Sequence, residues 1–170
     1  HAPADGPAVL ALELMENGTA DAEPLLTAYL QQRPSPEVRM AYARLLLEQQ
    51  RYPEARSQLK AVTTEKPDLP QAWLAQAALQ VQDQQYEAAE ASLGELLRLA
   101  KSSPDNETLR ASLTQAYLLH AQIAEKRGDY AAAEQWLQRI EDGKELFSAQ
   151  TRRASLLARQ GKLKEARALL

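Results

Sequence analysis

Tyr52-Pro-Glu-Ala-Arg-Ser-Gln-Leu59 contains a pattern that recurs along the chain: an aromatic residue, an alanine three positions later and a leucine four positions after that. The pattern returns three more times, as Tyr86, Ala89 and Leu93, as Tyr130, Ala133 and Leu137, and, with leucine in place of the aromatic residue, as Leu163, Ala166 and Leu170. A second alanine lies twelve residues before each repeated alanine, at Ala43, Ala77, Ala121 and Ala154. Two columns with spacings mostly in the thirties predict a stack of repeated helical units.

The repeated alanines are separated by 34, 44 and 33 residues, and these spacings divide the chain into units. We expect one solenoid over residues 1–170. A degenerate capping helix pair should occupy 7–34, after a frayed N-terminal segment at 1–6. Four repeats should then follow at 35–67, 68–101, 102–143 and 144–170, the last one truncated, with helices expected at 148–160 and 163–170.

Helix start signals refine these units. In the capping pair, Thr19 or Asp21 is expected to cap a helix that holds Pro24 in its first turn and buries Leu25, Leu26, Tyr29 and Leu30. Ser35-Pro36-Glu37 places a cap, a first helical residue and an acid in succession, and Ser103-Pro104-Asp105 repeats that signal. A helix from about Pro104 to Arg127 would be roughly 36 Å long and would overhang its counterparts by about 15 Å.

The two columns indicate how the units pack. Alanine allows paired helices to approach closely, whereas the leucines at positions 59, 93 and 137 fill the space between units. Gly94 lies in the middle of a predicted helix, where glycine costs about 1 kcal/mol relative to alanine. We therefore expect a neighbouring helix to lie close to Gly94.

Composition excludes several classes of function. A net charge of -3 argues against a nucleic-acid partner, since such binding needs a concentrated basic face. The chain has no cysteine, so disulfides, thiolate chemistry and sulfur-ligated metal are absent, although the compartment is left open. No apolar run approaches membrane-spanning length, so membrane association is expected only through a lipid anchor upstream of His1.

The repeated residues resemble the tetratricopeptide repeat, over roughly residues 36–170. The resemblance implies an all-α solenoid of antiparallel helix pairs that forms a right-handed superhelix, in which the first helices line a concave groove. The first-helix aromatics of the family are matched at Trp73 and Tyr117 but replaced by Arg39 and Gln150, and Pro67 is the one well-placed closing proline.

Residues 41–49 and 148–170 resemble, at a finer level, the long tetratricopeptide proteins of Gram-negative bacteria. Some of those proteins are envelope lipoproteins that scaffold periplasmic complexes, including adaptors for carboxyl-terminal processing proteases. The resemblance implies a periplasmic adaptor, with outer-membrane tethering as a further expectation and a cytoplasmic location as the alternative.

In this family a peptide or partner helix usually lies in the groove. The register assigns four residues of each repeat to the groove, Glu125 and Arg159 among them. Ten of these form the expected partner site: Met40, Arg44, Leu47, Gln71, Leu74, Ala78, Val81, Gln115, Leu118 and Gln122. The lysine and asparagine set with which chaperone-binding relatives clamp a C-terminal carboxylate is absent, so we expect an amphipathic helix or an extended apolar segment as partner. The alternative is that the apolar members of this set complete the core.

Catalytic and metal-binding patterns are missing. His120 is the one internal histidine, and no serine, aspartate or cysteine recurs at a spacing that would make a triad or a metal site with it. We therefore expect a core histidine, no cofactor, no metal and no enzymatic activity.

Charge is unevenly distributed: residues 1–35 carry a net -4 and residues 151–170 a net +5. Such ends would favour weak head-to-tail association, although an ordinary solvated surface is the alternative. The sequence thus predicts a protein-binding adaptor of unidentified partner; the alternatives are an accessory repeat domain of a larger enzyme and a self-assembling architectural module.

Overall fold

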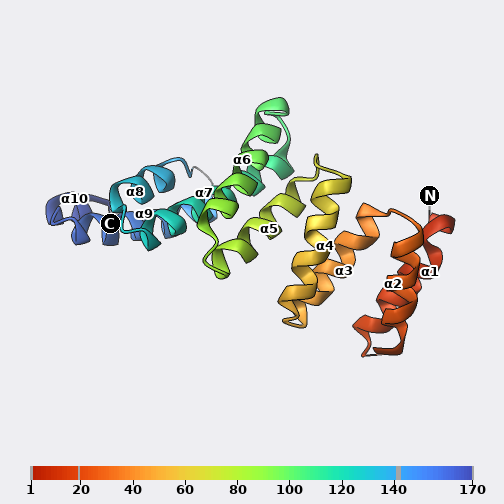
Figure 1. Ribbon diagram of the computed structural model, residues 1–170. Helices are drawn as coiled ribbons and strands as arrows, with labels where there is room; N and C mark the ends of the chain where they lie inside the picture. The colour runs from red at the N-terminus through yellow and green to blue at the C-terminus, as the bar shows by residue number, and fades with distance from the viewer. Residues whose placement is uncertain (1, 19, 141–142, 170) are drawn as a thin grey trace. The chain divides into compact units, whose positions relative to one another are not determined.

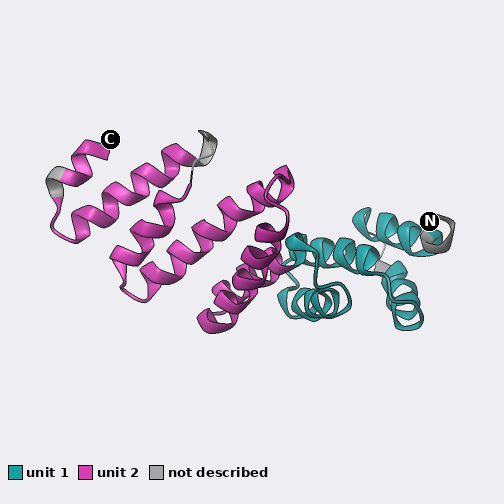
Figure 2. Ribbon diagram, turned by 90° about the horizontal axis from the view of Figure 1, so that it is seen from above, with its two compact units in different colours: residues 1–72 teal, residues 73–170 magenta. Residues whose placement is uncertain are grey.

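The computed structural model describes residues 2–18, 20–140 and 143–169, and these residues form helices and turns without a strand. The chain divides into two compact units, residues 1–72 and 73–170, which Figure 2 shows in different colours. The division falls within helix α5 (Pro70–Gln82).

Unit 1 contains the helices that precede α5 (Figure 1). Helix α1 packs against α2 and α3, and α3 packs against α4. The elements in order are α1 (Ala2–Glu16), the 3₁₀ turn η1 (Ala20–Ala22), α2 (Glu23–Gln32), α3 (Pro36–Glu48) and α4 (Tyr52–Glu65).

The capping pair differs from the expectation in three ways. Helix α1 begins at Ala2, so the prediction of a frayed segment at 1–6 was wrong. Helix α2 follows η1 directly and is capped by Ala22 without a side-chain hydrogen bond, not by Asp21; Thr19 lies outside the described residues. Leu25 is 68% exposed, because successive helical residues point about 100° apart and Leu26 and Leu30 take the buried side.

The first regular repeat follows the prediction. Helix α3 starts at Pro36 with Ser35 as its N-cap, and the carbonyl of Ser35 accepts from the Arg39 N–H at 2.9 Å. The Ser35 hydroxyl makes no capping bond. The predicted buried residues Ala43, Leu46 and Leu59 are all fully buried, which confirms the register.

Unit 2 continues the series of helix pairs. Buried residues of α5, α6 and α7 form one core cluster, and residues of α7, α8 and α9 form the next. Among the few buried polar groups, the hydroxyl of Ser92 accepts from Gln76 at 3.1 Å and donates to Gln80 at 2.7 Å, which ties α6 to α5. The helices after α5 are α6 (Tyr86–Ser102), α7 (Glu107–Lys126), α8 (Tyr130–Gln138), α9 (Gly143–Arg159) and α10 (Leu163–Leu169).

The repeated alanines and leucines occupy the core as predicted. Ala55, Ala89 and Ala133 are fully buried and Ala166 is 6% exposed. The repeated leucines at 59, 93 and 137 are at most 1% exposed. The last leucine of the pattern, Leu170, lies outside the described residues, as do residues 141 and 142. Helix α9 begins at Gly143, five residues before its predicted start.

The extra ten residues of the long interval are divided between two helices. Helix α6 has 17 residues where α4 has 14, and α7 has 20 where α5 has 13. Helix α7 begins at Glu107 rather than Pro104, because the Asn106 side chain caps it by accepting from the Leu109 N–H at 3.2 Å. The helix is therefore about 30 Å long, and it exceeds α5 by about 10 Å rather than the predicted 15 Å.

The turn between the two helices of each repeat has a common geometry. Gln50, Gln84, Gly128 and Gly161 occupy the same repeat position, and all four have a positive φ between 59° and 79°. The residue after each of them donates to a carbonyl five residues back, as Arg51 does to Leu46 at 2.8 Å. This is the Schellman ending of a helix, which favours glycine. Two of the four turns therefore use glutamine where glycine is less strained.

Gly94 does not mark a close helix contact, and that prediction was wrong. The residue is exposed on α6, and a Cβ built on it would meet no atom within 4 Å. Its neighbour Leu93 is fully buried, so the adjacent position points away from the core.

Candidate partner-binding surfaces

Helix α5 is uncharged along its whole length. Within unit 2 it exposes Ala78, half-buries Leu74 against the core and buries Val81, which is 5% exposed. Its amides at positions 76 and 80 are held by Ser92. A 13-residue helix without a charged residue is unusual for a chain of which 25% is charged.

Three of the four equivalent repeat positions of helix α7 are uncharged, and the fourth is Glu125, which is half-buried and pairs with Arg152 and Arg159. Gln115 is exposed, and Leu118 and Gln122 are half-buried. Leu118 also packs against the core cluster of α7, α8 and α9. We call Leu74, Ala78, Gln115, Leu118 and Gln122 the α5–α7 face; α5 and α7 share one core with α6.

The other predicted groove residues do not belong to this face. Met40, Arg44, Leu47 and Gln71 lie in unit 1, where Met40 is 6% exposed and belongs to the core. Arg44 is exposed, whereas Leu47 and Gln71 are half-buried. For Met40 and Val81 the structure therefore supports packing, the alternative that the sequence left open.

A hollow lies in unit 2 beside the N-terminal half of α7, and the groove pattern gave no indication of it. It has a volume of about 350 Å³ and a largely apolar lining from the end of α6, the start of α7 and the end of α8. The lining residues are Leu97, Ala100, Lys101, Ser103, Pro104, Leu109, Arg110, Leu113, Tyr117 and Arg139. We call this the α6–α8 hollow. Its origin is the length difference between α7, with 20 residues, and α8, with only nine.

An aromatic stack borders the hollow. The His120 ring lies parallel to the Trp136 ring at 3.9 Å, and the Arg139 guanidinium covers Trp136 at 4.3 Å from its centroid. Tyr117 lies 6.0 Å from Trp136. Cation–π and ring contacts of this kind hold Arg139 in place at the rim.

His120 belongs to the core, as the sequence predicted. It is 7% exposed, and its Nε2 atom has no hydrogen-bond partner. Burial lowers the pKa of His120. The charge of Glu90 raises this pKa in part, and the charge of Arg139 lowers it further. A neutral, stacked imidazole without a carboxylate or hydroxyl partner at Nε2 serves packing rather than proton transfer.

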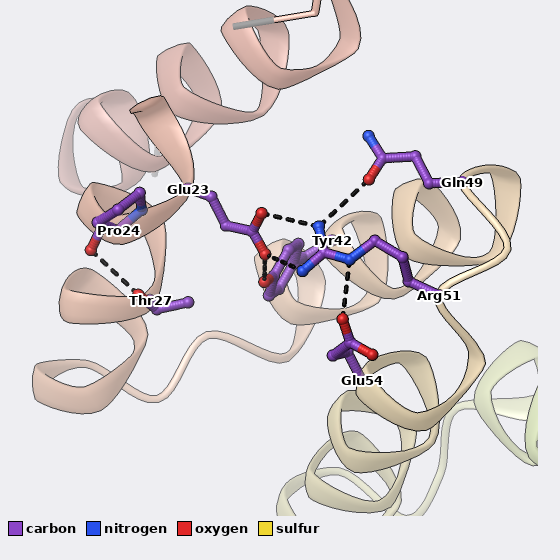
Figure 3. A network of polar contacts seen from close by, with 7 residues as sticks. All are labelled: Glu23, Pro24, Thr27, Tyr42, Gln49, Arg51 and Glu54. Atoms are coloured by element: carbon purple, nitrogen blue, oxygen red, sulfur yellow. Dashed lines mark hydrogen bonds and ion pairs between the residues drawn. The ribbon is translucent and has the colours of Figure 1, made fainter. Parts of the chain in front are cut away.

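Unit 1 contains a polar network that Figure 3 shows from close by. Arg51 donates through both terminal nitrogens to Glu23, at 2.8 and 2.7 Å, and through Nε to Glu54 at 2.8 Å. Tyr42 donates to the same Glu23 carboxylate at 2.5 Å. The Arg51 hydrogen bonds lower the pKa of Glu23, and burial together with the bond to Glu23 raises the pKa of Tyr42. The network ties the capping pair to the first regular repeat.

Profiles of the tetratricopeptide repeat match residues 13–79, and again residues 114–139 and 148–170. Together these segments cover more than half of the chain. The chain belongs to the tetratricopeptide repeat family. No curated protein sequence matches the chain significantly.

Solved structures of tetratricopeptide proteins share the fold. A tetratricopeptide repeat protein from Parabacteroides merdae has 20% sequence identity and a TM-score of 0.70. The match covers 99% of the present chain but only 63% of the length of the Parabacteroides protein. MamA from Desulfovibrio magneticus has 16% sequence identity and a TM-score of 0.73, and the match covers 99% of the present chain and 92% of MamA. PilF from Pseudomonas aeruginosa has 16% sequence identity and a TM-score of 0.70, and the match covers 98% of the present chain and 72% of PilF. The predicted all-α tetratricopeptide solenoid is confirmed.

This family assignment agrees with the chemistry of the side chains. Tetratricopeptide repeat proteins are generally non-catalytic scaffolds that bind proteins. The described residues include no cluster of three potential metal ligands. In the same part of the chain, no helix combines the length and the apolarity needed to cross a membrane.

Three of the six basic residues in 151–170 form ion pairs within unit 2. Arg152 and Arg159 pair with Glu125 at 3.2 and 3.3 Å, and Arg153 pairs with Glu134 at 2.8 Å. These ion pairs leave less positive charge for head-to-tail association than the sequence alone indicates.

Proposed function

We propose that this tetratricopeptide chain is a non-catalytic adaptor that binds a protein partner through the α5–α7 face. The observation that carries the proposal is that α5 has no charged residue and that α7 has uncharged residues at three of the four equivalent positions, the carboxylate of Glu125 being paired within the chain. Charged residues are depleted at the centre of protein interfaces, because each buried charge needs a partner. The face thus has the composition of a contact surface.

The side chains of the face suit an amphipathic helix or an extended segment. Leu74 and Leu118 are half-buried, so part of each side chain can contact a partner. Ala78 is exposed, and its small side chain leaves room for a side chain of the partner. The amides of Gln115 and Gln122 supply hydrogen bonds of either polarity. These features favour a partner with apolar anchors at helical spacing.

We further propose a periplasmic location, with attachment to the outer membrane through an upstream lipid anchor. The support is the resemblance of residues 41–49 and 148–170 to envelope tetratricopeptide lipoproteins. An adaptor of this kind would hold its partner beside a protease or another envelope complex.

The proposal is tested by crosslinking pull-down from periplasmic and cytoplasmic extracts. The double variant Ala78→Arg, Gln115→Arg places two bulky charges on exposed positions of the face. Leu74 and Leu118 are unsuitable targets, because both pack against the core. The matched control is Ala88→Arg, Gln135→Arg, the same changes at exposed positions of α6 and α8.

We expect the wild type and the control to capture the same periplasmic protein and the face variant to lose it. Equal capture by both variants would refute the assignment of the face. Capture of only further copies of the chain would refute the adaptor function, and capture from cytoplasmic extract alone would refute the location.

A further inference from the structure

The α6–α8 hollow has an apolar floor that the described residues of unit 2 leave uncovered. Leu109 is buried there, and Leu97, Leu113 and Tyr117 are half-buried. Its volume of about 350 Å³ lies within the usual range of ligand pockets, roughly 300–1,000 Å³. A wider hollow of about 730 Å³ adjoins it and shares Leu113, Tyr117 and Arg139. Together the two provide space for one bulky side chain and the backbone on either side of it.

The rim of the hollow is cationic in a protein whose net charge is -3. Lys101, Arg110 and Arg139 line the 350 Å³ hollow, and none of its lining residues in the described part of the chain is a carboxylate. Glu107, on the adjoining hollow, approaches Arg110 only at 3.9 Å with both side chains more than 60% exposed. Such an exposed contact neutralises little of the field. A positive rim therefore surrounds an apolar floor.

Arg139 is held in position before any ligand arrives. Its guanidinium stacks on Trp136 at 4.3 Å and lies 5.9 Å from the Tyr117 ring. A cation already fixed by stacking loses less conformational entropy when it pairs with a carboxylate. The rim thus combines one ordered cation with two flexible ones.

We propose that the α6–α8 hollow is a second binding site, which takes one aromatic or large aliphatic side chain of an acidic protein segment. The side chain lies on the floor of Leu109, Leu113 and Tyr117, and flanking carboxylates pair with Lys101, Arg110 and Arg139. Charge complementarity selects an acidic partner over a neutral or basic one. The site is separate from the α5–α7 face and does not depend on the function proposed for it.

The test uses the full chain labelled with ¹⁵N and three synthetic peptides. The probe, DEEFDEED, carries one phenylalanine between acidic residues. DEEADEED removes the anchor, and QNQFQNQQ removes the charge. We expect the probe to shift amide signals within residues 97–117 and at Arg139, and to bind about tenfold or more tightly than either comparison peptide.

A charge-reversal variant tests the rim. Lys101→Glu, Arg110→Glu is expected to weaken probe binding about tenfold or more. The matched control Lys60→Glu, Lys126→Glu makes the same change in net charge at exposed positions outside the hollow, and should bind within about twofold of wild type. Circular dichroism checks that both variants fold. Should the rim variant unfold, loss of probe binding by the wild type at about 0.5 M salt provides the same test.

Several results would overturn the proposal. These are no signal shifts at millimolar probe, equal binding of the probe and either comparison peptide, shifts confined to the α5–α7 face, and equal weakening by both charge-reversal variants. Displacement of the probe by phosphatidylglycerol vesicles that bind the wild type tightly would assign the rim to a lipid surface instead. Probe binding by Ala78→Arg, Gln115→Arg should be unchanged, so the two proposals fail independently.

Discussion

Replacing Gly94 by alanine should stabilise the protein. The residue lies inside the 17-residue helix α6, and an added Cβ would meet no atom within 4 Å. The substitution therefore adds helix propensity without a clash, and it also reduces the conformational freedom of the unfolded chain. The expected gain is about 0.5–1 kcal/mol in the free energy of unfolding.

A second glycine supplies the control. Gly128 is equally open to an added Cβ, but its φ of +79° belongs to the left-handed region. Gly128→Ala should therefore destabilise by about 1–2 kcal/mol, although the chemical change is the same. At the equivalent turn position Gln84, with φ 61°, the reverse change Gln84→Gly should stabilise.

Urea denaturation measures all three variants, because Trp73 and Trp136 both report on unit 2 by fluorescence and circular dichroism reports on helix content. The midpoint should rise for Gly94→Ala and Gln84→Gly and fall for Gly128→Ala. Loss of stability in Gly94→Ala would mean that a neighbouring segment does approach this helix face, and it would refute the register of α6.

Three further predictions concern the core and the charged groups. Leu93→Ala should lower the free energy of unfolding by about 2–5 kcal/mol, because Leu93 is fully buried, whereas Leu25→Ala should change it little, because Leu25 is 68% exposed; equal losses in urea titrations would contradict the burial. Burial lowers the pKa of His120, so the unfolded chain binds its proton at higher pH than the folded chain does. Stability should therefore fall as pH decreases below about 6.5, and a pH series of melting curves should lose this slope in His120→Phe. Arg51→Ala should cost about 1 kcal/mol, a modest value because the ion pair is partly exposed. Arg51 lowers the pKa of Glu23, so the contribution of their pair should disappear as pH falls below about 4.3; an unchanged difference between wild type and Arg51→Ala at pH 3 and pH 7 would exclude this role.

The limits of sequence reasoning are clearest at helix starts and at the groove. Ser35 and Ser103 each begin the same Ser-Pro-acid helix-start sequence. Helix α3 does start directly after Ser35, whereas α7 starts after Asn106. Ser103 and Asn106 both have side chains that can cap a helix, but Ser103 is the C-cap of α6, and Asn106 caps α7. In the groove set, Met40 and Val81 were assigned by register to an accessible side, but they are buried. A repeat position gives the direction of a side chain, not how much of its surface the neighbouring helices cover.

The sequence by itself determined the repeat, its two alanine columns and the buried leucines at 59, 93 and 137, because helical periodicity is a local property that recurs in each unit. Tertiary structure alone decided that the short helix α8 beside the long helix α7 leaves the α6–α8 hollow, and that Gly94 faces open space. It also decided that Glu125 and Glu134 pair with three arginines of the last repeat. Each of these depends on residues brought together from separate helices. The lengths and separations of packed helices are set by the sum of many contacts, which no single stretch of sequence contains.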